Sequence, residues 1–82
     1  MSPNDIQIRI RRTPFEPFRM FISDGAAFDI RHPDQCIVTT RTTVVAFPGP
    51  AGGGIYDGLA MVDNIHVTRL EPIAASVNGE AK

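Results

Sequence analysis

The Asp24-Gly25 pair, set between two runs of alternating apolar and polar residues, is the feature that most constrains this chain. Asp-Gly favours hairpin turns, because glycine accepts the positive φ that such turns require. The alternation on both sides has a period of two, which is typical of half-buried strands. The sequence therefore predicts a β-hairpin whose inner face carries Met20, Ile22, Phe28 and Ile30.

The rest of the chain consists mostly of further short runs rich in threonine, valine and isoleucine, which favour strands. The predicted strands cover residues 35–40, 42–47, 55–62 and 65–70. The first two form either one long bent strand or a hairpin turning at Thr40-Arg41-Thr42. Residues 48–54 are rich in glycine and proline and predict a flexible loop, and Gly58 is a candidate bulge. The pattern predicts a mostly-β fold, a small antiparallel barrel of about five strands.

The N-terminal residues 3–12 fit two periods. Ser2 is suited to cap a helix, with Pro3 at its first position, and Ile6 and Ile10 would share one face. A strand is also compatible with the sequence, because isoleucines alternate with polar residues at positions 6, 8 and 10. We favour a short N-terminal helix that ends before Thr13-Pro14, since the residue before a proline avoids the helical region.

The 82-residue length predicts one domain, residues 1–73, followed by a disordered tail, residues 74–82. A chain this short buries only about 60% of the surface that its unfolded form exposes, so its stability needs support. Cys36 is the only cysteine, which excludes a disulfide within the monomer, and we expect it to be a small buried hydrophobe. Two histidines and one cysteine offer no ligand spacing, so we expect no metal and no cofactor. Self-association is the remaining source of extra burial.

The formal net charge of −1 provides no overall attraction to nucleic acid or to an anionic membrane. No apolar run reaches the length of a membrane helix, and no export signal is recognisable, so we expect a cytoplasmic protein. Basic residues are nevertheless concentrated near the N-terminus. They form either an ordinary solvated surface or a nucleic-acid-binding face composed of Arg9, Arg11, Arg12 and Arg19.

Catalytic motifs are not evident in the sequence. The glycine-rich loop lacks the lysine and the following helix of a phosphate-binding loop. His32 and His66 lie beside predicted turns, and a small barrel filled by its own side chains leaves little room for a cleft. We therefore expect structural or surface histidines, no enzymatic activity and no small-molecule substrate.

Four segments together resemble a family of short bacterial proteins that is plentiful in planctomycetes and has no established activity. They are Pro14-Phe15-Glu16-Pro17-Phe18-Arg19, Asp24-Gly25, Ile30-Arg31-His32-Pro33 and Ile65-His66-Val67-Thr68-Arg69-Leu70-Glu71-Pro72. The resemblance spans about residues 5–72. It implies a shared fold and transfers no catalytic residue.

The predicted order of elements is also similar to that of Sm-like and SH3-like small barrels. In Sm-like proteins a glycine follows the aromatic residue of the hairpin, whereas here Phe28 is followed by Asp29 and Ile30. The RNA-contacting residues of Sm proteins have no counterpart at residues 63–66. The resemblance therefore implies a topology and does not by itself imply RNA binding.

These observations predict a non-enzymatic interaction module that self-associates through exposed strand edges. Apolar edge strands are templates for pairing with another chain. The candidate edges are residues 44–47 and the final strand, residues 65–70. The alternative function is an RNA- or DNA-binding protein of the Sm-like type.

Overall fold

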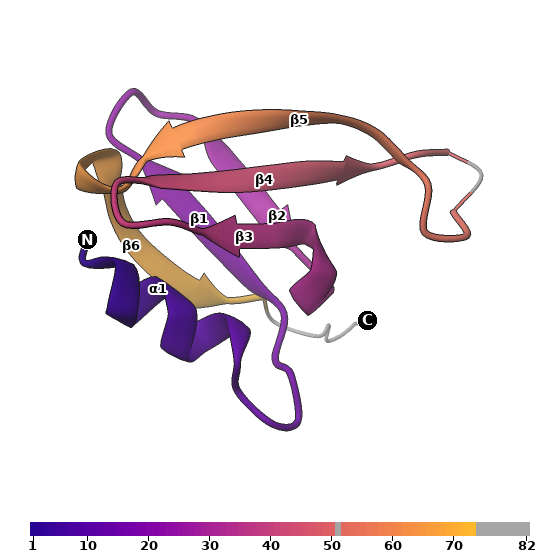
Figure 1. The fold of residues 1–82 in the computed structure, drawn as a ribbon, viewed down its shortest axis with the longest axis horizontal. Coiled ribbons are helices and arrows are strands. Elements are labelled where there is room, and N and C mark those ends of the chain that lie inside the picture. Colours follow the sequence, from indigo (N-terminus) through magenta and orange to yellow (C-terminus); the bar gives the residue numbers. More distant parts are fainter. Residues whose placement is uncertain (51, 74–82) are drawn as a thin grey trace.

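The computed structural model describes residues 1–50 and 52–73, which form one α-helix, two short 3₁₀ helices (Pro33–Gln35 and Asn64–His66) and six strands. The elements are α1 (Pro3–Ile10), β1 (Phe18–Ile22), β2 (Ala27–Ile30), β3 (Cys36–Val38), β4 (Thr42–Pro48), β5 (Tyr56–Asp63) and β6 (Val67–Pro72). The strands make two antiparallel sheets, which we name sheet A (β2-β1-β6) and sheet B (β3-β4-β5) (Figure 1). The predicted mostly-β fold is confirmed, with six strands instead of about five. Within the described residues the two sheets do not join into a closed barrel.

The hairpin predicted at Asp24-Gly25 is confirmed. β1 and β2 pair antiparallel with Met20 opposite Phe28, and Gly25 has a φ of 96°. Asp24 Oδ1 accepts a hydrogen bond of 2.9 Å from the Ala26 amide, which fixes the turn. On the predicted inner face Met20 and Ile30 are fully buried, while Ile22 and Phe28 are partly buried against them.

The N-terminal segment is a helix, as favoured. Ser2 Oγ accepts a hydrogen bond of 3.2 Å from the Asp5 amide and caps the first turn. Ile6 and Ile10, one turn apart, are both buried, whereas Ile8 is exposed on the opposite face. The cap and the buried pair together outweigh the weak helix propensity of isoleucine. The helix ends at Ile10, two residues before the predicted end at Arg12.

The alternative between one bent strand and a hairpin at residues 40–42 is settled in favour of the hairpin. β3 and β4 pair with Cys36 opposite Val45, and the Thr39 amide donates to the Thr42 carbonyl at 2.7 Å. In β5 the register shifts at Asp57, which has no partner on β4 and is adjacent to the predicted bulge at Gly58.

The last strand begins later than predicted. Residues Asn64–His66 form a 3₁₀ turn, so β6 starts at Val67 and continues to Pro72. It pairs with β1 and completes sheet A. The predicted disordered tail, residues 74–82, lies outside the described residues. No helix in residues 1–50 and 52–73 is long and apolar enough to cross a membrane.

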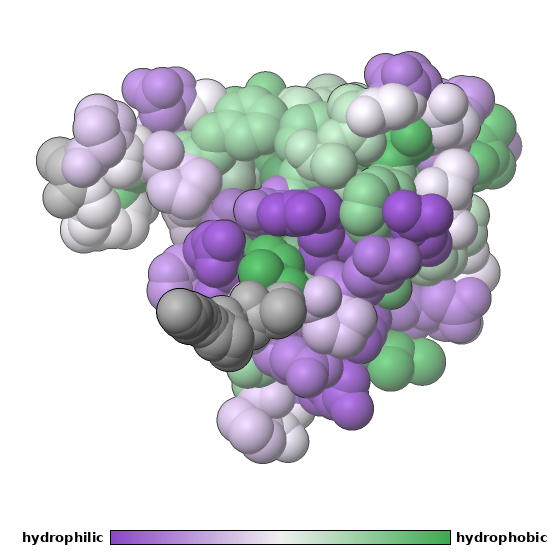
Figure 2. Space-filling view, turned by 180° about the vertical axis from the view of Figure 1, so that it is seen from behind, coloured by the Kyte–Doolittle hydropathy of each residue, from purple (hydrophilic) through white to green (hydrophobic). Residues whose placement is uncertain are grey.

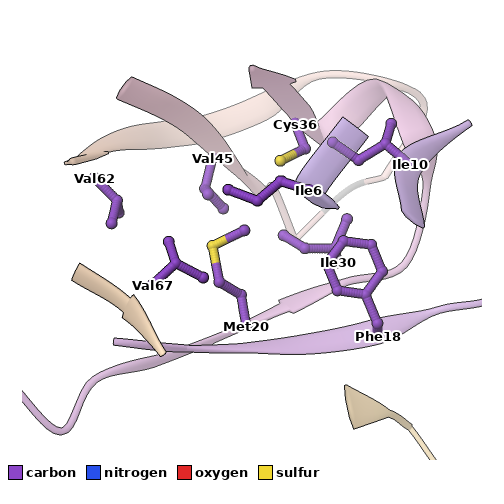
Figure 3. Packing of buried hydrophobic residues seen from close by; sticks show 9 residues of the cluster. All are labelled: Ile6, Ile10, Phe18, Met20, Ile30, Cys36, Val45, Val62 and Val67. Carbon is purple, nitrogen blue, oxygen red and sulfur yellow. The ribbon is translucent and has the colours of Figure 1, made fainter. Parts of the chain in front are cut away.

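The core lies between the two sheets and the helix (Figure 3). Phe15, in the segment before β1, packs against Phe18 with ring centroids 6.2 Å apart. The buried hydrophobic residues are Ile6, Ile10, Phe18, Met20, Ile30, Cys36, Val45, Val62 and Val67. Each element except β3 supplies large apolar side chains, and β3 supplies the smaller Cys36.

The first crossing between the sheets, from β2 to β3, is held by the buried side chain of Gln35. Its Oε1 accepts hydrogen bonds from the Arg31 amide at 2.7 Å and the His32 amide at 3.2 Å. Its Nε2 donates to the carbonyls of Asp29 in sheet A at 3.1 Å and Ala46 in sheet B at 3.0 Å. A single carboxamide therefore joins both sheets.

The second crossing, from β5 to β6, is held by buried Asn64. Thr43 Oγ1 donates to Asn64 Oδ1 at 2.6 Å, and Asn64 Nδ2 donates to the Thr39 carbonyl at 3.0 Å. The backbone N–H of Asn64 also donates to the Arg41 carbonyl at 2.7 Å. These bonds attach the 3₁₀ turn before β6 to the β3–β4 hairpin.

Replacing Gln35 by leucine is expected to lower the free energy of unfolding by about 3 kcal/mol, because similar bulk remains while two amides and two carbonyls lose their partner. Urea unfolding followed by circular dichroism measures this change. Gln7→Leu on α1, where the glutamine is only half-buried, is the matched control and should change stability little. Equal effects of the two substitutions would contradict the bridging role of Gln35.

Candidate functional site

The outer faces of the two sheets differ in chemistry. On sheet A, Arg19 lies opposite Asp29 on β2 and Glu71 on β6. Arg19 Nε donates to Asp29 Oδ1 at 2.6 Å, and Arg69 Nε lies 2.9 Å from Glu71 Oε2. Arg69 also stacks over Phe21, 4.0 Å from the ring centroid. Viewed from behind, hydrophilic residues gather in the middle and lower part of the molecule, while hydrophobic residues lie along the top of the view (Figure 2). Sheet A thus presents a face whose charges are paired.

The outer face of sheet B is apolar. The register places Ile37 opposite Val44 and Val44 opposite Met61, so these three residues form one row across the sheet. A second row joins Ala46 to Leu59. Ile37 and Leu59 are each 63% exposed and Met61 is 70% exposed. We name the five residues Ile37, Val44, Ala46, Leu59 and Met61 the apolar face.

β5 combines this apolar face with an unpaired backbone edge. It is an outer strand of sheet B, and no other described strand pairs with its second edge. Its sequence carries no lysine or arginine, and proline is also absent. Natural proteins protect a strand edge with such residues and also with other charges and bulges, and β5 carries Asp57, Asp63 and an irregular position at Asp57. The eight residues of β5 therefore offer the longest free edge in the described structure.

A groove of about 430 Å³ runs beside residues 60–63 of β5. Its apolar lining includes Ile22, Phe28 and Val62. Ser23, Asp24, Asp63 and His66 also line the groove. Ser23 Oγ lies 3.1 Å from His66 Nδ1, and the Ser23 amide donates to the His66 carbonyl at 2.8 Å. The groove separates residues 60–63 of β5 from residues 22–28 of the β1–β2 hairpin.

The four arginines predicted to form a nucleic-acid-binding face are not brought together. Arg9 and Arg12 share Glu16, at 3.7 and 2.9 Å, and the Arg9 side chain is only 19% exposed. Arg9 also stacks 5.4 Å from the centroid of the Phe18 ring. Arg19 is on sheet A, paired with Asp29. Arg11 caps the end of α1 and is exposed. The Arg9 Nε and Nη2 atoms are buried without a hydrogen-bond partner among the described residues.

The prediction that residues 44–47 form an exposed pairing edge is wrong. These residues lie in β4, which is the central strand of sheet B and pairs with β3 on one side and β5 on the other. The β-branched composition indicated a strand correctly. Its neighbours depend on the return of the chain through the glycine-rich loop, which local sequence does not specify.

Cys36, His32 and His66 are the residues for which only structural or surface roles were expected. Cys36 is buried in the core, as predicted. Neither histidine forms an ion pair with a carboxylate in residues 1–50 and 52–73. In the same residues no three histidine, cysteine, aspartate or glutamate side chains are close enough to bind a metal together.

Leu59 and Met61 are the residues that the sequence reasoning missed. A signal was present in Leu59-Ala60-Met61-Val62, where apolar residues occupy both faces of one strand. Such a strand must either be covered on both sides or expose one apolar side. In a small domain with a single core the second outcome follows.

Comparison with known proteins identifies no relative: no family model, no curated protein and no solved structure matches this chain. The assignment of a site therefore depends on the geometry described above.

The Arg19–Asp29 pair predicts a specific acid dependence of stability. The hydrogen bond from Arg19 is the main cause that holds the pKa of Asp29 below its ordinary value. A carboxylate with a lowered pKa stabilises the fold above its unfolded pKa, and this contribution is lost as the pH falls through the folded value. Asp29→Asn should therefore weaken the loss of stability below about pH 4. Urea unfolding at several pH values measures the free energy of unfolding as a function of pH. Asp34→Asn is the control on an exposed acid, and identical pH profiles for the two variants would contradict the prediction.

Cys36 should be chemically inert in the folded protein. Burial raises the pKa of its thiol to about 12, so very little reactive thiolate is present at pH 8. We expect negligible reaction with an aromatic disulfide reagent in buffer and complete reaction in guanidinium chloride, measured by absorbance. Rapid reaction of the native protein would show that the thiol is accessible.

Proposed function

We propose that this chain is a non-enzymatic interaction module that self-associates through the free edge of β5. The observation that carries the proposal is an eight-residue edge strand whose outward side chains, Leu59 and Met61, are 63% and 70% exposed. Unpaired amides and carbonyls along such an edge form hydrogen bonds with a second strand, and the exposed apolar side chains leave water at the same time.

The small core supports the same function. Nine hydrophobic residues are buried in the described structure, while eight large hydrophobic residues remain exposed. Small domains generally obtain the missing burial from disulfides, metals or subunit contacts. A lone cysteine leaves no disulfide within the chain, and subunit contacts on the apolar face are the route that these side chains favour.

We also propose that the two sheets are a variant of the Sm-like or SH3-like small barrel. The support is the order of elements: a helix, a hairpin, a passage from sheet A to sheet B at residues 33–35, and a 3₁₀ turn that returns the chain to β6 beside β1. Cytoplasmic location is proposed on the single reduced Cys36, which suits a reducing compartment.

The nucleic-acid-binding alternative receives less support. Three of its four arginines lie within ion-pair distance of Glu16 or Asp29, so these two carboxylates offset part of their charge. Phosphate recognition requires several cations directed at one strand. An enzymatic function is likewise not favoured, because the His66 imidazole in the groove is hydrogen-bonded to Ser23 and makes no ion pair with a described carboxylate.

Replacing Leu59 and Met61 together by lysine is expected to convert a self-associated protein into a monomer, because charged side chains protect a strand edge. Size-exclusion chromatography with light scattering, at hundreds of micromolar protein, measures the mass. The matched control replaces Ile8 and Ile65 by lysine; both are exposed apolar residues outside β5. A monomeric wild-type protein would refute self-association. Loss of association in the control variant would show that the effect is not specific to β5.

A further inference from the structure

We infer that the partner of β5 is the β5 strand of a second copy, paired antiparallel about Ala60, with Leu59 of each copy opposite Met61 of the other. This inference rests on the proposed self-association and adds its strand, its symmetry and its register. The two copies would form one six-stranded sheet with a two-fold axis perpendicular to the sheet.

The other free edges are poorer partners for β5. β2 has four residues and β3 has three, which gives few hydrogen bonds. β6 ends in Pro72 and carries Arg69 and Glu71, joined by an ion pair. Pairing β5 with β6 would set apolar side chains against charged ones. The second β5 strand offers an apolar edge of equal length.

The alternation of side chains limits the possible registers. Residues opposite each other in an antiparallel pair lie on the same side of the sheet, and a shift by one residue exchanges the two sides. The outward residues of one copy must therefore lie opposite the outward residues of the other. This requirement leaves registers centred on Leu59, Ala60 or Met61 as those that pair the middle of the strand.

Among the outward residues, the register centred on Ala60 pairs the most apolar side chains. It places Leu59 opposite Met61 twice, once on each side of the axis. Centring on Met61 instead sets Leu59 opposite Asp63, and centring on Leu59 sets Met61 opposite Asp57. Apolar cross-strand pairs stabilise a sheet, whereas an apolar residue opposite an exposed carboxylate does not.

The same register makes the apolar face continuous across the two copies. The row Ile37, Val44, Met61 of one copy meets Leu59 and Ala46 of the other, and the symmetric row is completed in the same way. The groove of about 430 Å³ beside residues 60–63 lies next to the edge where the second strand would be added. The contact therefore covers the β5 edge and joins the two apolar faces into one continuous surface.

Acidic residues limit the strength of this contact. In the Ala60-centred register Asp57 of one copy lies toward Asp63 of the other at both ends of the paired segment. Asp57 occupies the irregular position of β5, where it has no partner on β4. Like charges across a strand pair oppose pairing. Asp57→Asn should therefore lower the dimer dissociation constant by about fivefold at low salt, measured by sedimentation. An unchanged or higher constant would overturn the register.

Cysteine cross-linking tests the register directly. Leu59→Cys and Met61→Cys proteins are mixed and oxidised, and the disulfides are quantified by mass spectrometry. We expect about a tenfold excess of 59–61 over 59–59 and 61–61 disulfides, because directly opposed side chains approach disulfide geometry. The wild-type protein, which retains only buried Cys36, is the control and should form no disulfide.

The remaining outcomes separate the two proposals. A dominant 59–59 or 61–61 disulfide would overturn the Ala60 register and keep the β5–β5 pairing. An associated protein without any of these disulfides would overturn the β5–β5 interface and leave self-association standing. A monomer by light scattering at hundreds of micromolar would overturn both.

Discussion

The fold depends on two buried carboxamides at the places where the chain passes between the sheets. Gln35 hydrogen-bonds backbone groups of β2 and β4, and Asn64 ties the turn before β6 to the β3–β4 hairpin. Each side-chain carboxamide forms hydrogen bonds with donors and acceptors that would otherwise be buried without partners. Leaving such a group unpaired costs about 1–3 kcal/mol. Because only nine hydrophobic residues are buried in the part of the chain that the structure describes, such polar contacts contribute to how the sheets are set against each other.

The strand register then gives the outer faces of the two sheets different side chains, charged on sheet A and apolar on sheet B. Arg19, Asp29 and Glu71 meet across sheet A because they occupy opposite positions on three neighbouring strands. The same rule brings Val44 and Met61 together on sheet B. Charges on sheet A are paired within the chain, so that face can remain exposed to water without a partner. The apolar face of sheet B has no such internal partner among the described residues.

Local signals in the sequence were sufficient for local structure. The Asp24-Gly25 hairpin and the cap at Ser2 are set by neighbouring residues, and both were predicted. Pairing between distant segments was not, because it depends on how the loop at residues 48–54 returns the chain. For this reason the burial of β4 between two strands and the dispersal of Arg9 and Arg19 to separate surfaces were missed. The exposure of Leu59 and Met61 could have been predicted from the sequence, because their strand is apolar on both sides.

A free apolar edge normally exposes a protein to open-ended aggregation, and the pairing inferred for β5 would occupy that edge. Two-fold pairing uses both β5 edges and leaves only the three-residue β3 strands at the ends of the joined sheet. Edges that short provide few hydrogen bonds for another chain. Through β5, the inferred isologous contact would close at two copies. The irregular position at Asp57 restricts regular pairing to the middle of the strand, so the contact stays limited in strength as well as in number.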